Sequence, residues 1–149
     1  MAEELSKQQL HILINAVNNY IKKKGLKKSR IKEKFPLLVA VAEVVLKDVI
    51  DAINNHTCPY CKARVKTRHG IIRHILIFHS DTYYSDLRQV VDIYVKLRKM
   101  LVKASKSVRG VSTQVFRLVV GNRVIVGKQS ELAREIVKNP NILKELGVL

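Results

Sequence analysis

Two cysteines and two histidines in the middle of the chain have the spacing of a metal site. They follow one another as Cys58, Cys61, His74 and His79, the pattern C-x2-C-x12-H-x4-H. Two thiolates on a turn and two imidazoles about one helical turn apart can close tetrahedrally around one Zn2+ ion. Because four protein ligands leave no open position for water or substrate, the pattern predicts one structural zinc ion and no catalytic one.

Two apolar residues near these ligands support the same interpretation. Val65 lies four residues after Cys61, and Ile71 lies six residues further on. In ligands and in these core positions, residues 56–80 resemble the two-Cys, two-His zinc-finger family, and the resemblance covers about a sixth of the chain. It implies a ββα unit whose base-reading positions are Thr67, Gly70 and Arg73, a set that is poorly filled because glycine has no side chain.

Other interpretations of the two cysteines are weaker. The Cys-Pro-Tyr-Cys sequence at residues 58–61 resembles the redox motif of glutaredoxins, but neither of the other two prolines lies in the cis-proline setting that family needs. A disulfide would leave the matched histidines and core positions unexplained. His56 and His69, the nearest other histidines, rank as spare ligands.

The net charge points to a polyanionic partner. Of 149 residues, 28 are Lys or Arg and 12 are acidic, which gives a formal charge of +16. Because 47% of the residues are hydrophobic, we expect a folded basic protein and not a disordered basic tail. No apolar run reaches the ~20 residues of a membrane span and no signal peptide is recognisable, so we expect an intracellular location.

The first half of the chain reads as two helices. Ser6 and Gln9 form a capping box, and apolar residues then follow at helical spacing as far as Ile21. A strongly basic segment, residues 22–34, separates this helix from a second one. Leu37–Ile53 is apolar on almost every side, so we expect one central core helix there.

The second half predicts a long helix, a hairpin and short helices. Apolar residues alternate at steps of three and four from Leu87 to Val108, which predicts one helix with a packed seam and an opposite cationic face. Two β-branched runs joined by Gly121-Asn122 predict a β-hairpin over Val115–Val126. A short helix is expected from Ser130 to about residue 139, followed by a last turn or two.

These elements predict a mostly α (α+β) fold in one composite domain, with an embedded ββα finger. Its parts are residues 1–54, a two-helix region; 55–80, a zinc finger docked on the helical body; 81–110, a long amphipathic helix; and 111–149, a β-hairpin with short helices. Docking is expected because apolar residues surround the second half of the finger helix.

The charge and the finger together favour a nucleic-acid-binding protein. The leading hypothesis is a DNA-binding transcriptional regulator, with a composition typical of archaea and their viruses. RNA binding, a homodimer, or docking on a protein partner within a large nucleoprotein machine stay open. Catalysis is disfavoured, because the predicted zinc is closed and no glycine-rich phosphate loop or carboxylate cluster is present.

Candidate nucleic-acid contacts fall on three stretches, of which the basic segment and the long helix could instead be solvated surfaces. They are Lys62, Arg64, Lys66, Thr67, Arg68 and Arg73 on the finger; Lys22, Lys23, Lys24, Lys27, Lys28 and Arg30 on the basic segment; and Lys96, Lys99, Lys103 and Lys106 on the long helix.

Overall fold

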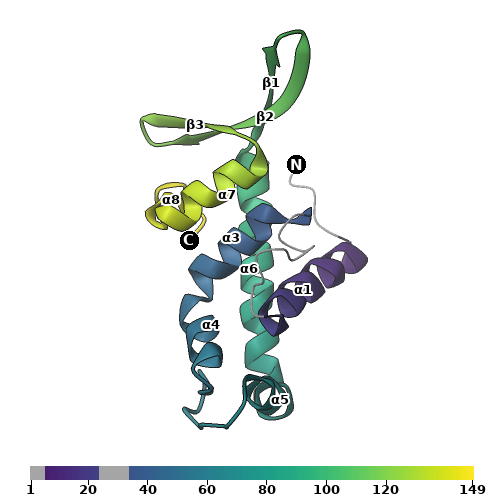
Figure 1. Ribbon diagram of the computed structural model, residues 1–149, viewed down its shortest axis with the longest axis vertical. Coiled ribbons are helices and arrows are strands. Elements are labelled where there is room, and N and C mark those ends of the chain that lie inside the picture. Colours follow the sequence, from purple (N-terminus) through teal and green to yellow (C-terminus); the bar gives the residue numbers. More distant parts are fainter. Residues whose placement is uncertain (1–5, 24–33) are drawn as a thin grey trace.

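The computed structural model describes residues 6–23 and 34–149, most of them helical (Figure 1). The elements in chain order are α1 (Lys7–Lys22), α3 (Pro36–Val45), α4 (Lys47–Asn54), α5 (Arg68–Phe78), α6 (Ser80–Met100), β1 (Val102–Val108), β2 (Val111–Val120), β3 (Arg123–Gly127), α7 (Gln129–Lys138) and α8 (Asn141–Glu145). Helices with one small antiparallel sheet confirm the predicted mostly α (α+β) class.

The long helix α6 forms the axis of the molecule. Its 21 residues give a length of about 30 Å at 1.5 Å per residue. One side of it is buried, from Tyr83 through Leu87 and Val90 to Leu97. Helices α1 and α3 pack on this buried side, and α5 lies across its lower end in Figure 1. The described elements therefore share one core along α6.

The first helix forms as its sequence predicts. The Ser6 hydroxyl accepts a hydrogen bond from the backbone of Gln9, and the Gln9 side chain accepts one from the backbone of Ser6, both at 3.2 Å. This capping box satisfies two backbone donors that the helix start would otherwise leave free. At the far end, Val17 and Ile21 are buried against α6.

The predicted single helix over Leu37–Ile53 is two helices, so that expectation is wrong. The chain turns at Leu46, whose φ and ψ are −102° and 23°, and α4 begins at the next residue. Val44 and Val45 are β-branched, which lowers helix propensity before the break, and Asp48 lies in the first turn of α4, where a negative charge is favourable. The fully apolar part is α3, buried from Leu37 to Ala42.

The predicted long helix ends sooner than expected. It stops at Met100, and Leu101 is extended, with φ and ψ of −76° and 132°. Residues 102–108 form strand β1, so Lys103 and Lys106 lie on a strand and not on a helix. The turn that follows explains the difference, because Arg109 and Gly110 both have positive φ, 52° and 78°, as a type I′ hairpin requires.

The second hairpin is confirmed. Strands β2 and β3 pair antiparallel around Gly121-Asn122, and Gly121 has a φ of 58°. Helix α7 packs on α3 and on β3, and it buries Leu132 and Ile136. It begins at Gln129, one residue before the predicted start. None of the described helices is both long and apolar enough to cross a membrane.

Candidate metal centre and basic surfaces

Residues 56–65 fold into a tight loop that places the two cysteines side by side. The two strands expected of a ββα finger are not formed there, because only Thr57 and Arg64 pair, in an isolated antiparallel bridge. Inside it, the Cys58 amide donates to the Ala63 carbonyl at 2.8 Å, and the Lys62 amide donates to the Cys58 carbonyl at 3.0 Å. Lys62 adopts a positive φ of 65° to close this turn. The backbone therefore presents both thiols toward the adjacent helix.

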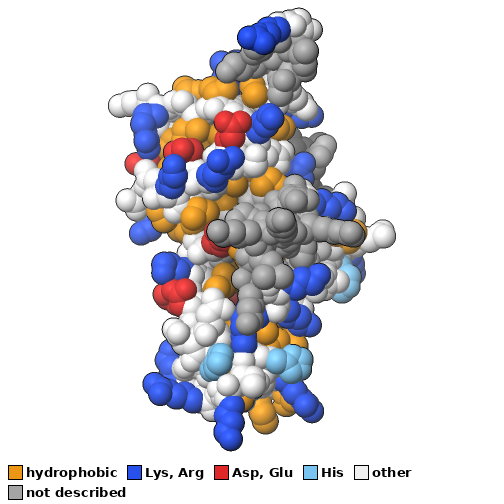
Figure 2. All heavy atoms as spheres, in the orientation of Figure 1, with side chains coloured by type: hydrophobic (Ala, Val, Ile, Leu, Met, Phe, Trp, Pro, Cys, Tyr) orange, Lys and Arg blue, Asp and Glu red, His pale blue; other side chains and the backbone are white. Residues whose placement is uncertain are grey.

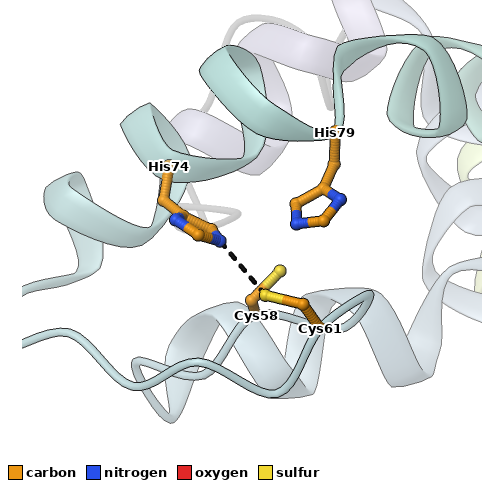
Figure 3. A group of neighbouring side chains, drawn as sticks. All are labelled: Cys58, Cys61, His74 and His79. Carbon is orange, nitrogen blue, oxygen red and sulfur yellow. Dashed lines mark hydrogen bonds between the residues drawn. The ribbon is translucent and has the colours of Figure 1, made fainter.

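The four predicted ligands converge (Figure 3). One donor atom from each of Cys58, Cys61, His74 and His79 lies within 4.8 Å of every other. Cys61 Sγ and His74 Nε2 are 3.3 Å apart. Ligands about 2.0–2.3 Å from a common tetrahedral ion fall within such a separation. The cluster can hold one metal ion. The two cysteines are free, so the disulfide alternative is not formed.

The loop that carries the two cysteines is held against the helical body. Cys58 has no exposed surface, whereas Cys61 is exposed and the two histidines are half-buried. The Tyr60 hydroxyl, between the cysteines, donates to Asp86 Oδ2 on α6 at 2.7 Å. Burial and this carboxylate raise the pKa of Tyr60, so the phenol keeps the proton that it donates. The loop is thereby anchored independently of the ligands.

His79 lies at the junction of two helices. Its amide donates to the Ile75 carbonyl at the end of α5, and its carbonyl accepts from the Tyr83 amide in α6 at 2.9 Å. Its φ of −134° departs from helical geometry, so the chain bends at this residue. A metal ion bound to His79 would therefore hold the angle between α5 and α6.

Helix α5 contributes to the same core as the helices around it. Ile71, Ile72 and Ile75 are buried in the cluster that includes residues of α1, α3 and α6. The last two apolar residues of α5 differ, because Ile77 and Phe78 are 60% and 70% exposed. Burial of the helix thus stops one turn before its end, leaving a small apolar surface beside His74.

Gly70, in the first turn of α5, lies where a larger residue would not fit. A Cβ at Gly70 would lie 2.6 Å from Val65 Cγ1 and 3.0 Å from Thr67 Oγ1. The Thr67 hydroxyl is already engaged as the N-cap of α5, accepting from the Gly70 amide at 3.0 Å. Val65 is β-branched and has few alternative rotamers. The close approach of the loop to α5 therefore requires glycine.

We expect Gly70→Ala to destabilise the protein by about 1–3 kcal/mol, because overcrowding at Val65 outweighs the helix propensity that alanine gains. Urea unfolding measures the change. In a Val65→Ala background, which removes the colliding methyl group, the same substitution should cost less. Equal costs in the two backgrounds would contradict this explanation of the glycine.

The basic candidates fall into separate groups. Lys62, Arg64, Lys66 and Arg73 are exposed on the loop and α5, and Figure 2 shows blue Lys and Arg side chains around this lower end of the molecule. Other exposed candidates are Lys22 and Lys23 at the C-terminus of α1, Lys96 and Lys99 on α6, and Lys103 on β1. Lys106 lies in β1. Lys24, Lys27, Lys28 and Arg30 lie outside the described residues.

Arg68 is not an available phosphate contact, so that prediction is wrong. Its side chain is buried, with 8% exposure. The guanidinium donates to the Lys22 carbonyl at 2.8 Å, to the Ile21 carbonyl, and to Asn54 Oδ1 at 3.0 Å. It thus caps the C-terminus of α1 and joins it to α4 and α5. Desolvation lowers its pKa, yet these acceptors keep the charge paired.

Comparisons with known protein families, with curated proteins and with solved structures each found no match.

Proposed function

We propose that the Cys/His cluster binds one structural zinc ion and that the protein binds nucleic acid, as a DNA-binding regulator of transcription. Two thiolates and two imidazoles are the donor set that favours Zn2+ in a closed tetrahedral site. Such a site leaves no coordination position for a reacting water. Zinc would therefore organise the surrounding surface and take no part in catalysis.

The observation that carries the proposal is the absence of acidic residues from the loop and helix that supply the four ligands. From Ala52 to Ser80 the chain contains no Asp or Glu, while Lys62, Arg64, Lys66 and Arg73 are all exposed there. Unpaired cations on a rigid surface bind phosphates and release condensed counterions. The adjoining N-terminus of α5 adds the positive end of a helix dipole.

Neutralising three of these cations should flatten the salt dependence of binding. For Arg64→Gln, Lys66→Gln and Arg73→Gln combined, the slope of log K against log salt should fall by about 0.9 for each DNA phosphate that the variant no longer neutralises. Fluorescence anisotropy at several salt concentrations measures it. Lys62 is kept, because its positive φ serves the turn.

The matched control is Lys7→Gln, Lys138→Gln and Lys144→Gln, three exposed lysines far along the chain from the cluster. An equal loss in both triple variants would mean that only net charge matters and that the cluster surface is not the contact. Absence of binding by the wild type at low salt would favour a protein-docking module, for which Ile77 and Phe78 offer an exposed apolar contact.

A further inference from the structure

Strands β1 and β2 form a ribbon that extends beyond the third strand. β3 pairs only with residues 116–120 of β2, whereas β1 pairs with residues 111–117. The pairs from Ala104↔Val115 to Val108↔Val111 are therefore two-stranded. Figure 1 shows this part rising from the helical body, and the main contacts of β1 are with β2. We call residues 104–115 the ribbon.

The dimensions of the ribbon suit a DNA groove. Its five residue pairs extend about 17 Å at 3.4 Å per residue, and a two-residue turn at Arg109-Gly110 closes it. The major groove of B-form DNA, about 12 Å wide and 8.5 Å deep, admits a two-stranded ribbon. The major groove of A-form RNA is too narrow for side chains to enter.

The charged residues in the stretch of chain that contains the ribbon are all basic. Between Asp92 and Glu131 the chain has no acidic residue but nine basic ones. They are Lys96, Arg98, Lys99, Lys103, Lys106, Arg109, Arg117, Arg123 and Lys128. Lys103 at the base of the ribbon and Arg109 at its tip are exposed. No acidic side chain of this 38-residue segment would repel a phosphate, and Arg123 is paired with Glu145 of α8 at 3.3 Å.

The ribbon also carries groups that can bind base edges. In its register Ser105 is paired with Gln114, and Ser107 with Ser112. Hydroxyl and amide groups donate and accept hydrogen bonds, as base edges in the major groove do. The first and last pairs of the ribbon, Ala104 with Val115 and Val108 with Val111, are apolar, so its polar residues lie between apolar ones along each strand.

We propose that the ribbon enters the major groove of double-stranded DNA, with Lys103 and Arg109 contacting the flanking phosphates. The inference rests on the proposed nucleic-acid binding. It specifies B-form duplex DNA as the nucleic acid that is bound. The ribbon and the Cys/His cluster lie at opposite ends of α6 (Figure 1), so the groove contact can be removed without touching the metal ligands.

A shortened-ribbon variant tests the proposal. Residues 105–114 are replaced by Asn-Gly, which joins Ala104 to Val115 through a tight hairpin turn. Binding is measured on a DNA duplex, on an RNA duplex of the same sequence, and on a DNA duplex with bulky groups at C5 of its pyrimidines, which project into the major groove. Lys138→Gln with Lys144→Gln is the control that removes the same two charges.

The wild type should bind unmodified DNA roughly tenfold or more tightly than either other duplex, and the shortened variant should lose this preference. Wild-type binding with the preference unchanged in the shortened variant would overturn the ribbon contact alone. No wild-type binding to any duplex would overturn the proposed function as well. If the shortened chain does not fold, Lys103→Gln with Arg109→Gln keeps the hairpin and removes the two proposed phosphate contacts, and it should weaken DNA binding more than the control variant does; equal weakening would overturn these contacts.

Discussion

Cys58→Ser is expected to abolish tight zinc binding and to lower the free energy of unfolding by more than ~5 kcal/mol. Structural zinc in small finger domains contributes apparent free energies of about 10–16 kcal/mol, comparable to the whole stability of a domain. Cys58 is fully buried in the main core, and among the described residues only Cys61, His74 and His79 converge with it. Loss of this ligand should therefore destabilise the packing of α5. Because His79 is also a predicted ligand, it should destabilise the junction between α5 and α6 as well.

Urea unfolding of zinc-loaded protein, with and without chelator, measures the effect. The wild type should become as unstable in chelator as Cys58→Ser is without it. His69→Ala is the control, because His69 is exposed on α5 and is not one of the four converging residues. A Cys58→Ser protein as stable as the wild type would mean that the cluster has no structural role. Loss of zinc by His69→Ala would revise the ligand set.

Arg68→Met should cost about 3 kcal/mol or more, although arginine is normally a surface residue. The substitution leaves the Ile21 and Lys22 carbonyls and the Asn54 amide oxygen without this donor, and the hydrogen bond to Ile21 is buried. Arg68→Lys keeps the charge but cannot supply donors in a planar fork, so an intermediate loss is expected. Thermal and urea unfolding of the wild type, Arg68→Lys and Arg68→Met should rank their stabilities in that order, from highest to lowest.

The effect on nucleic-acid affinity should differ between Arg68 and the exposed Arg73. At a temperature where both variants are folded, Arg68→Met should bind DNA as the wild type does, whereas Arg73→Met should bind more weakly. Reduced affinity in Arg68→Met with unchanged stability would restore Arg68 as a contact residue and contradict its structural role.

Local patterns predicted much of the fold and the cluster. The capping box at Ser6, the hairpin at Gly121-Asn122 and the spacing of the four ligands each depend on residues close together in sequence. Their geometry follows from turn and helix periodicity, which the sequence displays directly. The predicted ligand set converges for this reason.

Features that depend on distant partners were not predictable in the same way. Two of the three acceptors of Arg68 lie 46 and 47 residues earlier on α1 and the third 14 residues earlier at the end of α4, so nothing in its local sequence separates it from Arg64. Residues 101–108 satisfy a helical period through Leu101, Ala104 and Val108. Pairing with β2 decides in favour of a strand. The Arg109-Gly110 turn between β-branched residues was the signal that could have revealed it.

A titration of duplex DNA with zinc-loaded wild type and with Cys58→Ser, at low and moderate salt, tests the central claim most directly. A zinc-organised nucleic-acid-binding protein predicts wild-type binding that weakens steeply with salt and is lost or greatly reduced in Cys58→Ser. Binding of equal strength by both proteins, or none by the wild type at low salt despite its charge of +16, would contradict the claim.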